Sequence, residues 1–384
     1  MTAKESNRTI HFVPGLRFSC TGCGKCCHND WDLPVTKTKA ESIGQTDLFK
    51  QKVREGYLPL QLVSDDLYIL GSRPDGGCVF LDGELCEIHR DIGPDAKPLT
   101  CQLFPLNLVR APDGYHVSLS FACPAVLAGV GPPIEERRSW LTGFVATDDD
   151  IPPLTRVIDD VSLSANLDIS YADYLRLESE LLGCLDDSLC PQGLVNWACT
   201  LLEGGLAQFS PMKVSDLLPE ALDLLDVFSR TIVGIIELEV SPDEREAYIQ
   251  ALATDFAGRS NKLDVSLPVF SYYRPPSEMC RTSMVRFLRS QFAGKRLLTG
   301  SSVVSRLLAF ATGLAILCYY VEAQARETGS LHFSFQQLER AFALVEENIL
   351  THSDDLDPFF DSYENALLRM MAAYESEKEH LQLS

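Results

Sequence analysis

Four cysteines lie within eight residues of the sequence CTGCGKCC: Cys20, Cys23, Cys26 and Cys27. Each C-x2-C step lets two thiolates converge on one metal within a tight turn, and two overlapping steps bring three thiolates together. Gly22 and Gly24 flank Cys23 and permit the backbone conformations that such a loop needs. Cys27 is harder to place on the same tetrahedral ion, because neighbouring side chains tend to point apart, so it can serve another iron, another site or redox chemistry. The spacing predicts that residues 20–27 form a metal-binding loop.

Two predicted hairpins bring four more cysteines toward this loop. The segment GGCVFLDGELCEIHR (residues 76–90) has apolar stretches on both sides of Asp82-Gly83, a strong type I′ turn signal, and its arms carry Cys78 and Cys86. A second hairpin is expected over residues 106–120, with its turn at residues 111–114, and Cys101 and Cys123 flank it. A short strand is also expected at residues 66–70. The predicted metal ligands are Cys20, Cys23, Cys26, Cys27, Cys78, Cys86, Cys101 and Cys123. No motif identifies a catalytic residue.

Five further cysteines and two nearby histidines are not predicted to bind metal. The five cysteines occur singly in apolar, helical-looking surroundings, where a free thiol packs as a small hydrophobe. They are Cys184, Cys190, Cys199, Cys280 and Cys318. His28 and His89 are the histidines nearest to the predicted ligands, and we expect them to donate hydrogen bonds near the thiols or to lie on the surface.

Charge and hydropathy limit the classes of partner. Residues 1–130 carry a net charge of -2 and the remaining residues a net charge of -19, which argues against nucleic-acid binding and favours a basic, lysine-rich protein partner or simply solubility. The N-terminal residues lack the apolar segment of a signal peptide. Residues 307–321 are apolar over fifteen positions, fewer than the ~20 needed to span a bilayer, and predict a buried core helix. We therefore expect a cytoplasmic protein with reduced thiols and no membrane association.

Secondary-structure signals predict an α+β protein. Residues 1–130 form a small, hairpin-rich cysteine-cluster domain for metal binding, residues 131–153 a helix and linker, and residues 154–384 an acidic all-helical domain with about seven helices. Capping boxes predict helix starts at Ser241, with Glu244, and at Ser334, with Gln337. The last helix is expected over residues 357–380.

Three sequence blocks resemble a known family in their order and spacing. CTGCGKCC, GCVFLDGELCEIH and KPLTCQLFP are similar to the CxxCxxCC cysteine-cluster family, whose domain is associated with chelation of zinc or iron, and the likeness covers roughly residues 16–125. Lys97 stands where the family usually has arginine, and Gln102 follows Cys101 where arginine is common, which puts an anion-binding role of those positions in doubt.

Longer members of this family append a helical half, and the layout here is similar to that of the flagellin lysine N-methylases. Those proteins methylate lysines and are associated with an iron–sulfur cluster. The resemblance implies a protein-lysine N-methyltransferase activity with S-adenosylmethionine as the methyl donor. The early cysteines are spaced differently, however, and the sequence has neither a glycine-rich nucleotide loop nor the C-x3-C-x2-C pattern of radical S-adenosylmethionine enzymes.

The sequence leaves two choices open. An iron–sulfur cluster, [4Fe–4S], is favoured over zinc by the all-thiolate ligand set and the doubled cysteine, although eight cysteines also suffice for two zinc sites. The protein is either a metal-binding enzyme that modifies a protein or a non-catalytic zinc or iron chelator or redox sensor with a helical interaction platform. A third possibility is that the metal only stabilises a small domain with a weak core.

Overall fold

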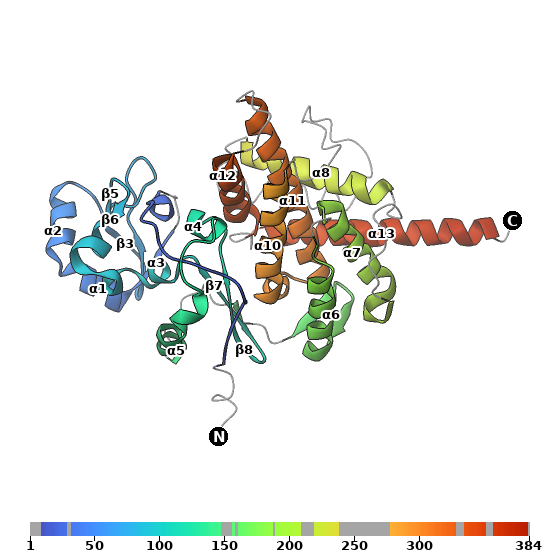
Figure 1. Cartoon of the computed structure of the whole chain (residues 1–384), viewed down its shortest axis with the longest axis horizontal. Coiled ribbons are helices and arrows are strands. Elements are labelled where there is room, and N and C mark those ends of the chain that lie inside the picture. Colours follow the sequence, from blue (N-terminus) through green and yellow to red (C-terminus); the bar gives the residue numbers. More distant parts are fainter. Residues whose placement is uncertain are drawn as a thin grey trace, which may run out of the picture. The chain divides into compact units, whose positions relative to one another are not determined.

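The computed structural model describes residues 9–28, 32–146, 156–157, 160–186, 189–208, 219–237, 277–327, 334–350 and 356–382 (Figure 1). The chain divides into two compact units, one of residues 1–110 and 117–156, the other of residues 111–116 and 157–384. Small sheets of few strands dominate the first unit and helices dominate the second, so the predicted α+β class is confirmed. The predicted domain limits, residues 1–130, 131–153 and 154–384, stay predictions.

A three-stranded sheet and two helices support the first unit. Its strands are β2 (Pro34–Thr36), β3 (Leu60–Ser64) and β4 (Leu67–Leu70), in the antiparallel order β2-β4-β3. The helices α1 (Lys37–Gly44) and α2 (Asp47–Arg54) follow β2. Buried side chains of this region form one apolar cluster, against which Cys78, Cys86 and Cys101 pack. Strand β4 confirms the strand predicted at residues 66–70.

The first predicted hairpin exists, but it is shorter and shifted. Strand β5 (Leu81–Asp82) pairs with β6 (Leu85–Cys86), with Leu81 opposite Cys86. The turn is therefore centred on Gly83-Glu84, one residue later than predicted, and only Gly83 takes a positive φ, of 59°. Cys86 lies on a paired strand as expected. Cys78 instead precedes β5 and forms an isolated bridge with Ser72, because the pairing ends after two residues on each arm.

The second predicted hairpin is confirmed. Strands β7 (Leu106–Ala111) and β8 (Gly114–Leu119) are neighbours in a sheet of order β1-β8-β7-β9, with β1 at Ile10–Phe12 and β9 at Arg156–Val157. Cys101 precedes this hairpin in α3 (Leu99–Leu103), and Cys123 follows it at the start of α4 (Pro124–Leu127). The helix expected after residue 131 is α5 (Arg138–Ala146).

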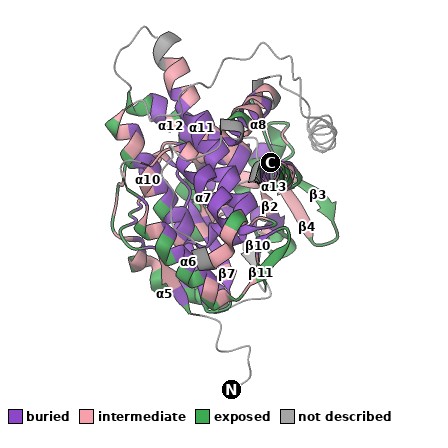
Figure 2. Cartoon of the chain, turned by 90° about the vertical axis from the view of Figure 1, so that its right-hand side faces the viewer, coloured by how far each residue is buried: buried purple, intermediate pink, exposed green. Residues whose placement is uncertain are grey.

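Helices form the core of the second unit. Seven α-helices are described there: α6 (Tyr171–Gly183), α7 (Pro191–Gly204), α8 (Pro219–Glu237), α10 (Glu278–Ala293), α11 (Val303–Glu327), α12 (Phe335–Val345) and α13 (Asp357–Gln382). Helix α11 packs against α7, α8, α12 and α13 and is buried along most of its length (Figures 1 and 2). Its segment Val303–Gln324 is long and apolar enough to cross a membrane, but 89% of its most apolar window is buried inside the unit. The predicted core helix at residues 307–321 is confirmed.

Local signals located some helix ends and missed one strand pair. Ser334 and Gln337 form the predicted capping box at the start of α12. The antiparallel pair β10 (Val161–Ser164) and β11 (Leu167–Ile169) contradicts the expectation that residues after 154 are all helical. These strands are only four and three residues long, too short to show a clear alternation. The predicted linker at residues 147–153 and the helix predicted from Ser241 lie outside the described residues.

Candidate metal centre

A single turn of 3-10 helix at Lys25–Cys27 shapes the cysteine loop. Gly22 and Gly24 have φ values of 68° and 67°, the left-handed region that glycine enters without steric cost, as predicted. The amide of Cys27 donates to the carbonyl of Gly24 at 2.8 Å and closes the turn. The sulfur atoms of Cys26 and Cys27 lie 3.9 Å apart. The expectation that adjacent cysteines point apart is therefore wrong here, because the tight turn brings their thiols to the same side.

Backbone contacts hold this loop against the β5–β6 hairpin. The amide of Cys78 donates to the carbonyl of Cys27 at 2.7 Å. A Cβ atom added to Gly24 would lie only 2.9 Å from the carbonyl oxygen of Glu84, so the loop and the turn of the hairpin are in direct contact. The hairpin thus reaches the cysteine loop through main-chain atoms, which leave no room for a side chain at Gly24.

Five of the eight predicted ligands gather around this contact. The Cys27 thiol hydrogen bonds with the sulfurs of Cys26 and Cys86. Cys78 and Cys101 are close enough to these thiols to act on them electrostatically. Cys123 is likewise close enough to Cys23 and Cys26 to interact with them electrostatically. Cys20 is the exposed member of the set, at the start of the loop. The structure thus brings cysteines from four separate segments together, while the ligand role of each one stays a prediction.

The thiols share protons unequally. Hydrogen bonding from Cys27 lowers the pKa of Cys26 to about 7 and that of Cys86 to about 6. For Cys86, backbone N–H groups of His89 and Ile88 also lower the pKa. The same hydrogen bonds raise the pKa of Cys27, which keeps the shared proton. Two sulfurs with low pKa values around one proton form a site in which a metal ion can replace that proton.

Burial acts on the other thiols in the opposite direction. Desolvation raises the pKa of Cys78 to about 11, that of Cys123 to about 11 and that of Cys101 to about 12. A thiol buried in this way stays protonated unless a cation compensates its charge. These three cysteines are therefore suited to metal ligation and poorly suited to act as free nucleophiles.

Lys97 places a positive charge near the cluster. Its ammonium acts to lower the pKa values of Cys26, Cys86 and Cys101, in the case of Cys101 against the larger effect of burial. The amide of Gln102 donates to the carbonyl of Lys97 at 2.8 Å and to that of Asp95 at 3.1 Å, which fixes this segment. The replacement of the family's arginine by Lys97 therefore retains a cation beside the thiols. In the sequence Lys97 is notable only as a departure from the family pattern, and its proximity to the thiols follows from the fold.

A buried ion pair lies behind Cys86. The ammonium of Lys52, on α2, is 2.6 Å from a carboxylate oxygen of Glu87, and both side chains are about 90% buried. The amide of Glu87 donates to the carbonyl of Phe80 at 2.8 Å. The pair therefore fixes the residue that follows Cys86, and sequence patterns gave no sign of it, since Lys52 and Glu87 are distant in the chain. His28 and His89 are both exposed and lie on the surface, one of the two positions expected for them.

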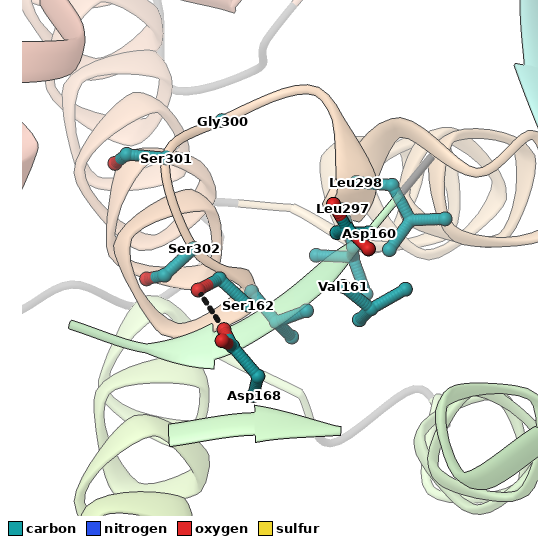
Figure 3. A pocket seen from close by; sticks show the side chains of 10 residues that line it. Asp160, Val161, Ser162, Asp168, Leu297, Leu298, Gly300, Ser301 and Ser302 are labelled. Carbon is teal, nitrogen blue, oxygen red and sulfur yellow. Dashed lines mark hydrogen bonds between the residues drawn. The ribbon is translucent and has the colours of Figure 1, made fainter. Parts of the chain in front are cut away.

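A small cavity in the second unit contains none of the predicted ligands. Figure 3 shows it between β10, β11 and the start of α11, with Ser162 donating to Asp168 at 2.6 Å. Its volume is about 110 Å³, whereas small-molecule sites usually measure roughly 300–1,000 Å³. Within the described residues, this cavity does not accommodate a methyl donor of the size of S-adenosylmethionine.

Comparisons with known proteins agree with this location of the site. Residues 19–123 match the sequence model of the CxxCxxCC family, described as a "putative zinc- or iron-chelating domain". "Uncharacterized protein MJ0939" from Methanocaldococcus jannaschii is 25% identical over 100 residues, which cover 26% of this chain and 33% of that protein. The chain thus spans about a third of the length of this curated relative. No solved structure matches. The predicted resemblance is confirmed for a segment that contains all eight candidate ligands.

Proposed function

We propose that the first unit holds an iron–sulfur cluster of the [4Fe–4S] type on thiolates drawn from the eight cysteines. The observation that carries this proposal is the convergence of Cys26, Cys27, Cys78, Cys86 and Cys101, with Cys123 near Cys23 and Cys26. One zinc ion needs only four ligands. The gathered thiols exceed that number, and all of them are soft ligands suited to iron–sulfur clusters.

The spread of the sulfur atoms supports a polynuclear centre. With metal–sulfur bonds of about 2.3 Å, four thiolates on one tetrahedral zinc lie about 3.8 Å from one another. Among the described residues, no three of these sulfurs lie within 4.8 Å of one another. Thiolates on a cluster bind different irons and are therefore farther apart. The donor set fits such a group better than it fits one mononuclear ion.

Several residues of this chain would tune the bound group. A cluster supplies one-electron chemistry, and its reduction potential depends on net charge, hydrogen bonds to sulfur and solvent exposure. The amides of Ile88 and His89 donate to the Cys86 sulfur, and Lys97 adds positive charge. Both features stabilise the more negative, reduced state. Cys78 and Cys101 are largely removed from water by the apolar cluster beneath them.

Zinc is the second candidate, and one distance favours it. The 3.9 Å between the sulfurs of Cys26 and Cys27 is close to the ~3.8 Å edge of a zinc–thiolate tetrahedron. In this alternative the protein is a non-catalytic chelator or structural metal module, with the helical unit as an interaction platform. It needs no further cofactor site, which accords with the small size of the described cavity.

For the cluster-bearing protein we propose a role in modifying a basic, lysine-rich protein partner in the cytoplasm. The net charge of -19 beyond residue 130 would attract such a partner. Lysine methylation is the specific activity implied by the layout shared with flagellin lysine N-methylases. Incubating the loaded protein with lysine-rich peptides and S-adenosylmethionine, followed by mass spectrometry, tests this activity, and unmodified peptides would leave only the metal-binding role.

Metal analysis after anaerobic purification tests the cluster itself. We expect iron and acid-labile sulfide near four per chain and a brown absorption that bleaches with dithionite. Cys86→Ser should lose most of both, whereas Cys199→Ser, a buried cysteine on α7, should keep them. One or two zinc ions without sulfide or colour would overturn the cluster and favour the zinc module.

A further inference from the structure

Three sulfur-bearing side chains meet in the helical unit, far along the chain from the cysteine loop. The thiol of Cys280 lies 3.8 Å from the thioether sulfur of Met284, one turn later on α10. The thiol of Cys318, on α11, lies 4.0 Å from the same sulfur. The thiols of Cys280 and Cys318 hydrogen bond with each other. Two cysteines that stand singly in the sequence therefore meet in the fold, and the three sulfurs form a triangle.

This triangle is almost completely shielded from solvent. The exposed fractions are 1% for Cys280, 2% for Met284 and 3% for Cys318. Ser277 accepts a hydrogen bond from the amide of Cys280 at 3.1 Å and fixes the first turn of α10, so the position of this thiol is set by a helix cap. Two rigid helices therefore present the three sulfurs to one another.

The spacing of the sulfurs suits a three-coordinate metal. Three sulfurs around one ion in a plane, with bonds of about 2.3 Å, lie about 4.0 Å apart. The two edges of the triangle that meet at Met284, 3.8 Å and 4.0 Å long, match this value closely. Thiolate and thioether ligands favour Cu(I), zinc and iron–sulfur clusters, and since zinc usually takes four ligands, a set of three sulfurs favours Cu(I). Glu322, one turn beyond Cys318 on α11, is near enough to add negative charge.

We propose that Cys280, Met284 and Cys318 form a binding site for one Cu(I) ion. The ion enters as a monovalent cation, two metal–thiol bonds and one metal–thioether bond form, and one thiol proton leaves to solvent. No electron is transferred, and the loaded site carries no net charge, which suits its burial. The site is independent of the function proposed for the first unit, because none of its residues belongs to the cysteine cluster.

Methionine methyl NMR distinguishes this site from the thiols of the first unit, which would also take up Cu(I). The full chain, carrying its native metal and labelled with ¹³C at the methionine methyl groups, is titrated anaerobically with Cu(I) buffered by bicinchoninate. Met284→Leu, a change of similar volume, assigns the Met284 signal. We expect that signal to shift in the native chain, and Met284→Leu to bind one Cu(I) fewer per chain.

Two alanine variants make the test specific. Cys318→Ala should abolish the shift of the Met284 signal, whereas Cys199→Ala, a cysteine of similar burial on α7, should retain it. Circular dichroism melts identify a variant that fails to fold. If an alanine variant does not fold, the number of Cu(I) ions bound by Met284→Leu decides whether the site exists. A Met284 signal that stays in place up to saturation of the cysteine cluster, or unchanged capacity in Met284→Leu, would overturn the site and leave a packed apolar contact.

Discussion

Replacing Gly24 by alanine is the sharpest test of how the fold forms the metal centre. Gly24 has a φ of 67°, and a Cβ atom there would lie 2.9 Å from the Glu84 carbonyl oxygen and 3.0 Å from the Glu84 Cα. These are backbone atoms of the hairpin that carries Cys86, so no side-chain rotation relieves the overlap. The hairpin turn must move by about half an ångström to restore an ordinary contact.

Two costs add up in the Gly24→Ala variant. The left-handed backbone costs a residue with a Cβ atom about 1–2 kcal/mol. Overpacking against a fixed neighbour costs about 1–3 kcal/mol more. We therefore expect the free energy of unfolding to fall by about 2–5 kcal/mol. Metal content should also fall, because the loop and the hairpin supply different ligands of one centre.

Gly22→Ala is the matched control for this experiment. Gly22 has nearly the same φ, 68°, but the nearest atom to its added Cβ is a side-chain carbon of Leu85 at an ordinary 3.5 Å. This variant should lose only about 1–2 kcal/mol and keep its metal. Urea unfolding and metal content per chain are measured for both variants. Equal losses in the two would refute the argument that contact with Glu84 positions the cysteines.

Three further predictions concern stability. Lys295→Met should destabilise the protein by about 3–5 kcal/mol in urea unfolding, since the buried Glu178, 2.5 Å from the Lys295 ammonium, loses its counter-charge. The double variant, Lys295→Met with Glu178→Leu, should recover most of this loss of stability. A double variant without any recovery would contradict the pairing. Burial raises the pKa of Glu364 in the folded protein above its usual value of about 4.5. The free energy of unfolding therefore falls as the pH rises from about 4.5 through the folded-state pKa, because the unfolded chain loses this proton first. Glu364→Gln should therefore gain stability relative to the native chain between pH 4 and 7, and a pH-independent difference would count against this. Metal removal by a chelator should increase hydrogen exchange in residues 20–27 and 78–101 while α11 stays protected, and uniform exchange would contradict a local role of the metal.

Sequence spacing predicted much of the cysteine centre, but not its internal arrangement. The C-x2-C steps, the two glycines and the two hairpins are local patterns, and each was found near its expected position. The approach of the Cys26 and Cys27 sulfurs depends on one 3-10 turn. The bond from Cys78 to Cys27 joins segments 51 residues apart. Such contacts follow from tertiary packing, which residue spacing does not encode.

The helical unit shows the same division between local and distant information. The box formed by Ser334 and Gln337 marks a helix start because its hydrogen bonds connect residues three apart. The meeting of Cys280 with Cys318 depends on how α10 and α11 face each other. In the sequence each of these cysteines stands alone in an apolar stretch, so single-residue reasoning assigned them to ordinary packing.

The central position of α11 has a consequence for synthesis of the chain. Its apolar surface is covered partly by α7 and α8, which leave the ribosome before it, and partly by α12 and α13, which leave after it. A nascent chain whose residues up to 330 have left the ribosome therefore presents a long apolar helix with two sides uncovered, a target for chaperones or membrane-insertion machinery. We expect a released chain truncated at residue 330 to be cleaved by protease within α11, and the full chain, which includes α13, to be protected there.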